Sequence, residues 1–242
     1  MKNYFYDFHI HSALSPCADD DMTPNNIVNM AMLNGLDIIA LTDHNSTKNC
    51  RAVEKVAKEQ GVIFIPGMEL CTSEEIHTVC LFPTVEDASA FDLEIYGGIM
   101  PIKNKPDIYG NQLILDENDN VTGIEDILLV TASSVPLYDV VALVEKYNGI
   151  ALLAHIDRHS SGVLGILGNI DPDMGFCLAE VSKNATDGRY QDKFPFLSFV
   201  SDSDAHHLWD IAEASENNVI SGNFFSSSEV IDYFRSYSRK IS

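Results

Sequence analysis

Short apolar runs alternate with amphipathic helical patterns along most of this 242-residue chain. Strands that alternate with helices form βα units, whose parallel strands are covered by helices. Residues 4–11 are expected to be the first strand. The helix after it begins at Thr23-Pro24, an N-cap residue followed by proline at the first helical position, and ends before Gly35. The chain is therefore expected to fold as an α/β protein with a largely parallel sheet or barrel.

The alternation continues through two stretches of the chain. Further strands are expected at residues 36–42, 62–66, 76–82, 150–155, 176–181 and 197–201, with helices at 47–60, 135–147 and 227–237. Between about residues 83 and 134 the rhythm breaks, and a polar turn separates two short apolar segments within 112–121. We therefore predict a single domain over residues 1–242, with a hairpin-containing insertion at about 83–134 that covers the site and shapes specificity.

The net charge of −21 limits which partners the chain can bind. Affinity for nucleic acid comes largely from Lys and Arg that neutralise phosphates, so this charge argues against long DNA or RNA. A small phosphorylated substrate remains compatible, because bound divalent cations reverse the local sign of a carboxylate-rich site.

Cysteine usage and hydropathy bear on the compartment. The five cysteines are odd in number and form no C-x-x-C pair, which argues against a disulfide framework or a structural zinc knuckle. No apolar stretch reaches the ~18 residues of a membrane span, and no signal peptide is recognised at the N-terminus. We therefore expect a cytoplasmic protein with no membrane partner. The oligomeric state is left open.

Six of the eight histidines fall at or near the ends of expected strands: His9, His11, His44, His77, His155 and His206. In βα barrels the carboxyl ends of the strands converge on one face, where active sites are built. His77 differs from the other five because its strand continues past it. His159 and His207 lack this placement and are expected to be surface residues.

Carboxylates accompany these histidines. His9 and His11 lie two residues apart on a strand, so both rings point the same way, although such a pair seen alone is as often a solvated polar face. Asp43 lies in Thr-Asp-His, Glu69 ends Gly-Met-Glu, and Asp204 lies in Ser-Asp-Ser-Asp-Ala-His. Mixed imidazole and carboxylate donors favour Zn²⁺, Mn²⁺ or Fe²⁺ over Ca²⁺.

The ordered series H-x-H, T-D-H, G-x-E, a further His, A-H and S-D-x-D-A-H resembles the PHP (polymerase and histidinol phosphatase) family of metal-dependent phosphoesterases. The resemblance implies a distorted (βα)7 TIM-like barrel with two or three divalent transition metal ions as cofactors. It assigns the ligands in three sets: His9, His11, Glu69 and Asp204 for one metal, Glu69, His77 and His155 for a second, and His44 and His206 for a third.

Two segments depart from the family pattern. The loop after His11 lacks the usual ligand, and Asp20, which is included in the predicted metal set, competes for this role with Asp19 and Cys17. After His155 the chain reads Ile-Asp-Arg where the family usually has proline. The arginine there, Arg158, can grip a phosphate bidentately, although a loop arginine is more often solvated or ion-paired.

Two further acids are expected to support the ligands. Metal-bound imidazoles commonly bond a carboxylate through their second nitrogen, so we expect Asp43 to fix the His44 ring. Asp202 has a similar but weaker claim.

These assignments predict a metal-dependent phosphoric ester hydrolase that uses a metal-activated water on a small phosphorylated metabolite or nucleotide. Its predicted catalytic residues are Glu69, Asp204 and Arg158. The alternative is an amidohydrolase-type C–N hydrolase or deaminase with a similar metal site, a class that often uses a carboxylated lysine; Lys183 is the one lysine at an expected strand end. A catalytically silent module is disfavoured by the nearly complete ligand set.

Overall fold

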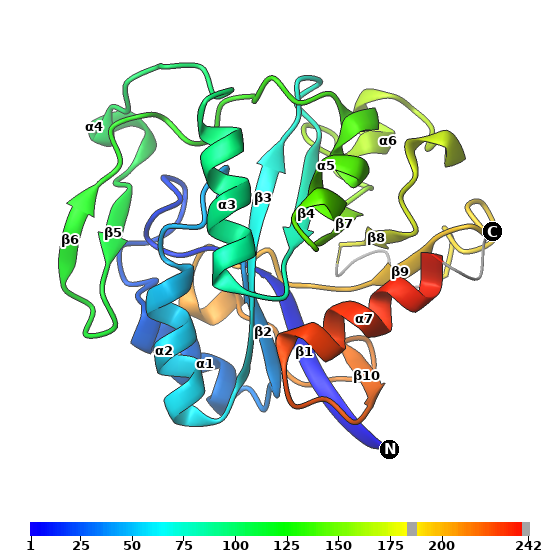
Figure 1. Ribbon diagram of the computed structural model, residues 1–242, viewed down its shortest axis with the longest axis horizontal. Helices are drawn as coiled ribbons and strands as arrows, with labels where there is room; N and C mark the ends of the chain where they lie inside the picture. The colour runs from blue at the N-terminus through cyan, green and yellow to red at the C-terminus, as the bar shows by residue number, and fades with distance from the viewer. Residues whose placement is uncertain (183–187, 239–242) are drawn as a thin grey trace.

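The computed structural model describes residues 1–182 and 188–238. Its main sheet has eight strands in the order β10-β1-β2-β3-β4-β7-β8-β9, curled inside a layer of helices (Figure 1). The strands are β1 (Lys2–Ile10), β2 (Ile38–Leu41), β3 (Ile63–Cys71), β4 (His77–Leu81), β7 (Ile150–Leu153), β8 (Leu178–Glu180), β9 (Ser198–Val200) and β10 (Val219–Gly222). The expected α/β class is confirmed.

The helices include the four that the sequence predicted, at about residues 24–33, 47–60, 135–147 and 227–237, and also helices within 83–134 and after β7 that it did not predict. The helices are α1 (Pro24–Leu33), α2 (Cys50–Gln60), α3 (Val85–Tyr96), α4 (Pro106–Tyr109), α5 (Val140–Lys146), α6 (Val163–Ile166) and α7 (Ser227–Ser238). Thr23 caps α1, since its side chain accepts a hydrogen bond from the Asn26 N–H, and Pro24 opens the helix. Gly61 ends α2 and has φ of 75°, a left-handed conformation that glycine adopts without strain.

The sheet is mixed; its curl is consistent with a distorted barrel, but the exact (βα)7 succession is not confirmed. β1, β2 and β3 are parallel, but β4 runs antiparallel to both β3 and β7, and β10 runs antiparallel to β1. A tight turn at residues 72–76 joins β3 to β4, too short for a crossover helix. This reversal puts the first residue of β4, His77, at the same rim as the last residues of its neighbours.

Beside the rim, the chain beyond the edge strand β9 contacts β1, the neighbour of the other edge strand, β10. The chain that follows β9 returns to β1, where the Ala205 carbonyl accepts a hydrogen bond from the His11 N–H at 2.9 Å and the Ala205 N–H donates to the His9 carbonyl at 3.2 Å. The Asp202 carboxylate accepts from the Phe8 N–H at 2.8 Å. The segment that follows β9 is thus fixed against β1.

The segment 83–134 is only partly separate from the sheet. Its helix α3 lies over β3, whereas the expected hairpin, β5 (Leu113–Leu115) and β6 (Val121–Ile124), stands apart at the edge in Figure 1. The chain before the hairpin pairs with the chain after it, since the Leu128 N–H donates to the Ile102 carbonyl at 2.8 Å. This pairing brings both flanks of the hairpin back to the rim.

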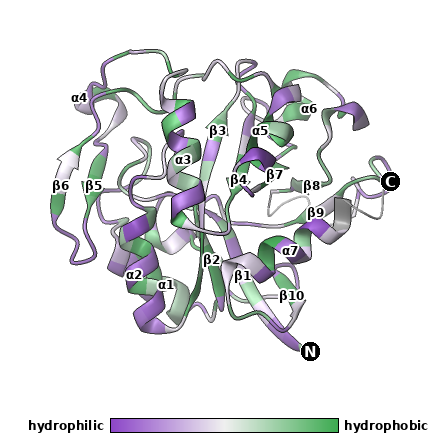
Figure 2. Cartoon of the chain, in the orientation of Figure 1, coloured by the Kyte–Doolittle hydropathy of each residue, from purple (hydrophilic) through white to green (hydrophobic). Residues whose placement is uncertain are grey.

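Apolar side chains fill both faces of the sheet. Strand β2 is hydrophobic along its whole length, whereas α2 and α3 mix polar and apolar residues (Figure 2). Ile38 packs in a cluster with Phe234 of α7, while the adjacent Ile39 packs with α1 and α2. This alternation is that of a strand covered on both sides. Within the described part of the chain, none of the helices has the length and apolar character needed to cross a membrane.

Candidate metal centre

The six strand-end histidines converge at one rim of the sheet. Four of them, His9, His11, His44 and His155, are buried, while the side chains of His77 and His206 are 18% and 22% exposed. Ring centroids of neighbours lie 4.1–6.0 Å apart. His159, by contrast, is exposed as expected. Residues from β1, β4 and the ends of three other segments therefore form one cluster.

Glu69 is the hub of this cluster. Its carboxylate oxygens lie within 3.4 Å of five imidazole nitrogens, which belong to His9, His11, His44, His77 and His155. Glu69 is held in place by strand pairing, since it lies opposite Val79 in the β3–β4 ladder and forms a bridge with His44. One buried carboxylate is thereby surrounded by nitrogen donors.

The donor atoms fit divalent cations. Three groups have their ligand atoms within 4.8 Å of one another: His9, His11, Glu69 and Asp204; His44, Glu69 and His77; and His11, His44 and His206. The first group is the same as the first predicted set. In the second, His44 stands where His155 was expected, while His155 Nε2 lies 3.0 Å from Glu69 Oε1. The ligand roles themselves remain predictions.

Several of these atoms have no hydrogen-bond partner within the described residues, although they are buried. They are His9 Nε2, His44 Nδ1, Glu69 Oε2 and His155 Nδ1; His44 Nδ1 and Glu69 Oε2 lie 2.8 Å apart as an ion pair but are not aligned as a hydrogen bond. Buried polar atoms are nearly always satisfied, and unsatisfied ones indicate a missing ion, water or ligand. The residues present therefore fit a metal centre.

Nearby imidazoles lower the pKa values of the two central carboxylates, Glu69 and Asp204. Burial alone would raise the pKa of Glu69, but the imidazoles of His77, His9 and His44 outweigh it and hold that pKa well below its usual value. Burial would likewise raise the pKa of Asp204, and the nearby His9 reverses the effect, so the pKa is lowered. Both acids are ionised at neutral pH, as metal binding requires.

The pKa values of His11 and His44 are shifted in the opposite direction to that of His9. Burial lowers the pKa of His11 and of His44, so these rings are neutral and can donate a lone pair. Burial also acts to lower the pKa of His9, but the adjacent Glu180 carboxylate, with other acids, raises it well above the ordinary value. A cation bound at His9 would replace that proton.

Backbone strain appears at two of the candidate ligands. His155 and Asp204 have positive φ, 24° and 51°, a region that residues with a β-carbon rarely adopt. Such strain persists only where surrounding structure enforces it, and it gathers at functional sites. The chain is closely packed after His155, since a β-carbon on Gly162 would lie 2.7 Å from the His155 carbonyl oxygen.

Arg158 lies beside the cluster. Its Nη1 is 2.5 Å from Asp204 Oδ2, and its side chain is 46% exposed. With His155, Asp204 and Glu180 it lines a small cavity of about 170 Å³. The Arg158 guanidinium thus contacts a candidate metal ligand on one side and solvent on the other, so it is well placed to contact an anionic substrate.

The first loop contributes less than predicted to the described groups. Asp20 is exposed and accepts a hydrogen bond from Asn111 Nδ2 at 2.7 Å, and Asp19 faces His207 at 3.6 Å. Cys17 is exposed, although the protein around its thiol, with the charges of Glu69 and Asp204, raises the pKa of that thiol to about 12. None of the three belongs to the groups that the described residues form. Lys183 lies outside the described residues.

Comparison with known proteins identifies the family. A model of the PHP domain matches residues 7–192, more than half of the chain. The protein belongs to the PHP domain family.

Two curated relatives of this PHP domain have the names of enzymes that act on phosphate esters, but each match covers only a part of this chain and of the relative. A 5′-3′ exoribonuclease of Haemophilus influenzae is 37% identical over 79 residues, 31% of this chain and 28% of that protein. A 3′,5′-nucleoside bisphosphate phosphatase of Chromobacterium violaceum is 33% identical over 73 residues, 30% of this chain and 25% of that protein. The chain thus matches well under half the length of these relatives.

The fold of the PHP domain recurs in solved structures. Endonuclease Q, in complex with a 27-mer duplex substrate with an abasic lesion at the active site, has a TM-score of 0.63 at 17% identity, covering 86% of this chain and 50% of that one. At this identity the likeness concerns the fold alone.

Two supporting contacts in this PHP domain were missed by the sequence. Glu180 Oε2 lies 2.6 Å from His9 Nδ1, so the carboxylate fixes the proton on Nδ1 and directs Nε2 to the cluster. Glu180 ends β8, and the rule that singled out Glu69 would have found it. Ser15 Oγ contacts His11 Nδ1 at 2.9 Å, and no sequence signal marks that serine.

The two predicted supporting acids act elsewhere. Asp43 accepts hydrogen bonds from Ser12 and Ser15, so it supports His11 through Ser15, whereas support of the His44 ring had been predicted. The reason is the direction of the loop after His11, which folds back over the Asp43 carboxylate.

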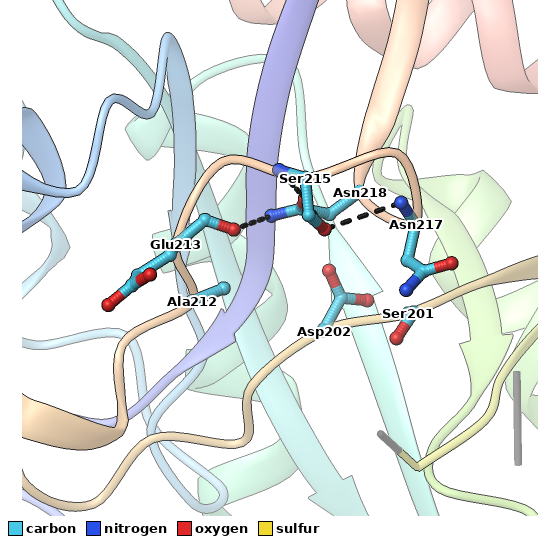
Figure 3. A pocket seen from close by; sticks show the side chains of 7 residues that line it. All are labelled: Ser201, Asp202, Ala212, Glu213, Ser215, Asn217 and Asn218. Atoms are coloured by element: carbon cyan, nitrogen blue, oxygen red, sulfur yellow. Dashed lines mark hydrogen bonds between the residues drawn. The ribbon is translucent and has the colours of Figure 1, made fainter. Parts of the chain in front are cut away.

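Asp202 lines the cavity beside Arg158 and also lies beneath the loop 212–218 (Figure 3). There it lines a pocket of about 260 Å³ in which Asn218 Oδ1 accepts from Ser215 Oγ (Figure 3). Burial, with the nearby Glu180 and Asp7 carboxylates, raises the pKa of Asp202 well above its usual value. It supports β1 through the Phe8 N–H, while its Oδ2 has no hydrogen-bond partner among the described residues.

Proposed function

We propose that this protein is a metal-dependent phosphoesterase that hydrolyses a small phosphorylated metabolite or nucleotide. The convergence of five imidazoles on Glu69, with Asp204 adjoining, carries the proposal. Membership of the PHP family and the names of its relatives support it. The reaction consumes one water, forms its bond to phosphorus and breaks the ester P–O bond to release an alcohol and phosphate.

The residues of the three groups would hold two or three divalent ions. Bound there, the ions would supply positive charge to the phosphoryl oxygens and lower the pKa of the attacking water. Glu69 and Asp204 would orient and charge-balance them, and Glu180 keeps the His9 ring in the required tautomer. Zn²⁺, Mn²⁺ and Fe²⁺ all suit this donor set.

Arg158 would contact the substrate phosphate. Its guanidinium is fixed at one end by Asp204 and half exposed at the other, so N–H donors remain for a phosphoryl oxygen. A phosphate seated there lies against the cavity shared by His155 and Asp204. This arrangement favours an anionic ester over the neutral amides of the alternative class.

The net charge supports a small substrate. A surface carrying −21 formal charges repels a long polyanion, whereas a single phosphate needs only the local positive charge of the centre. A short oligonucleotide belongs in the assay because two relatives named above act on nucleic acids.

The test combines metal analysis with a substrate screen. Protein purified without chelators should contain roughly two to three equivalents of transition metal, as multi-metal sites do. After removal and reconstitution with Zn²⁺, Mn²⁺ or Fe²⁺, it should release phosphate from a panel of phosphorylated metabolites and mononucleotides, and EDTA should abolish the release. Amides and aminopurines in parallel wells serve as controls for C–N hydrolysis.

Two outcomes would contradict the proposal. One is metal content well below one equivalent with no uptake on reconstitution. The other is release of ammonia or amine from the control compounds by a loaded protein that leaves all phosphoesters intact. Faster cleavage of the oligonucleotide than of any small ester would retain the chemistry and overturn the proposed substrate size.

A further inference from the structure

A second cavity, of about 550 Å³, opens beside His77. Its size falls in the range of small-molecule sites. His77 belongs to both places, since its Nδ1 lies 2.8 Å from Glu69 Oε1 while its ring lines the cavity. A group bound in the cavity would therefore touch the edge of the metal centre.

The wall of this cavity is mostly uncharged. Met100 and Ile102 line it and are 55% and 47% exposed, while Ser160 and Ser161 add hydroxyls. The described lining residues include neither lysine nor arginine, and Glu75 is the one carboxylate among them. Exposed apolar side chains gathered in a hollow mark a ligand site, and the acid at its edge repels anions.

The wall is fixed to the centre by Asn45, the residue after His44. Asn45 Nδ2 donates to the carbonyls of Leu129 and Thr131 at 2.6 and 2.8 Å, and its Oδ1 accepts from the Cys71 N–H at 2.9 Å. The Ser133 N–H also donates to the Cys71 carbonyl at 2.9 Å. This side of the cavity is thus pre-formed against the end of β3.

The loop between His155 and Gly162 divides the two cavities. Arg158 lines the small polar one and Ser160 and Ser161 line the large one. A substrate whose phosphate lies at Arg158 and the metal centre can extend the rest of its structure past His77. Among the described residues that line the two cavities, Arg158 is the one lysine or arginine, and it lies at the phosphate end.

Building on the proposed phosphoesterase function, we propose that the cavity beside His77 holds the nucleoside of a mononucleotide and that Glu75 excludes a second phosphate. A nucleoside has an apolar face for Met100 and Ile102 and polar edges for the serine hydroxyls. A nucleoside bisphosphate would bring a second dianion to a wall that carries a carboxylate and no cation.

The test compares kcat/KM for a nucleoside 5′-monophosphate, its 3′,5′-bisphosphate and glycerol 3-phosphate. The wild type should prefer the monophosphate to the bisphosphate by about tenfold or more, since like charges placed together across an interface are strongly unfavourable. Glu75→Lys should reduce that ratio at least about tenfold, and Glu75→Gln by less, with the effect shrinking as salt rises. Met100→Ala should raise KM for the nucleotide severalfold and leave glycerol 3-phosphate unchanged.

The control is Glu59→Lys, which makes the same charge change on the exposed side of α2, outside the cavity. It should leave the ratio at the wild-type value. A bisphosphate used as well as the monophosphate by the wild type, or a ratio that Glu75→Lys does not move, would overturn the assignment of the cavity. Absence of hydrolysis of every phosphoester by the metal-loaded protein would instead refute the function on which it rests.

Discussion

His9 and His77 both contact Glu69, yet their surroundings are opposite. His9 is fully buried, and its second nitrogen is bonded to Glu180 at 2.6 Å. His77 is partly exposed, begins an antiparallel strand and lines the larger cavity. One side of the centre is therefore fixed by buried carboxylates, and the other is open to a ligand.

This difference separates two tasks within one site. On the β1 side, burial and carboxylate partners hold the rings in one orientation, which is what binding a cation demands. On the β4 side, a wall whose one carboxylate is Glu75 adjoins the centre and can discriminate among leaving groups. Changes on the first side should act on metal content, and changes on the second should act on the choice of substrate.

The largest effect is expected at Glu69, which belongs to both sides. Glu69→Gln keeps the shape and removes the charge that five imidazoles face. Loss of residues that merely support ligands costs about 10–100-fold, so loss of the hub should lower phosphate release at least about a hundredfold and reduce bound metal. Elemental analysis and initial rates measure both.

The matched control for the hub is Glu94→Gln, which neutralises an acid on α3 that pairs with Lys146 of α5. It should retain wild-type metal and rates. Circular dichroism should show both variants folded. Wild-type turnover by folded Glu69→Gln would remove the hub role and, with it, the link between the two sides.

Arg158 should give the next largest effect, on one side only. Arg158→Ala removes a charge-assisted contact worth on the order of 1.5–3 kcal/mol, so kcat/KM for a phosphoester should fall roughly tenfold to a hundredfold while metal content stays unchanged. Arg158→Lys should recover little, because an ammonium lacks the planar fork. Metal lost together with activity would show instead that the 2.5 Å contact positions Asp204.

Arg51→Ala is the control for this arginine. Arg51 is 47% exposed and ion-paired with Glu54 and Glu86, so it matches Arg158 in exposure and pairing but lies on α2. Its loss should leave kcat/KM unchanged. Equal losses in the two variants would mean that the effect at Arg158 is general surface electrostatics.

The sequence predicted the fixed side of the centre better than the open side. His9 and His11 follow from a local rule, because residues two apart on a strand share a face. The position of His77 depends on the direction of β4, and apolar periodicity reveals a strand without its direction. The exact (βα)7 succession, which the family resemblance implied, is not confirmed, because β4 is antiparallel and has no crossover helix before it; β10, a short strand paired with β1, was not predicted.

Supporting contacts were harder to predict than the cluster itself. Glu180 carried the strand-end signal and was overlooked, whereas Ser15 carried none, since hydroxyls are common in loops. Asp43 was assigned to its sequence neighbour His44, but the folded loop brings Ser15 between Asp43 and His11. Contacts that depend on how a loop returns are set by tertiary packing, which a linear pattern does not encode.

Ser15 should give the smallest of these effects, confined to the fixed side. Its hydroxyl donates to Asp43 Oδ1 at 2.7 Å and accepts from the His44 N–H at 3.1 Å. Because its one proton is used on Asp43, it accepts from His11 Nδ1–H, which leaves the His11 Nε2 lone pair facing Asp204 at 3.1 Å. Ser15→Ala should therefore weaken metal affinity about tenfold, measured by competition with a chelating dye.

Ser15→Thr distinguishes a positioning role from simple loss of packing. Threonine keeps the hydroxyl and should restore most of the metal affinity, while its extra methyl group changes the packing of a buried position. The selectivity between mono- and bisphosphate should be the same in both variants, because that choice is made beside His77. A tenfold loss in both variants would indicate a packing effect, and a changed selectivity would show that the two sides of Glu69 are coupled.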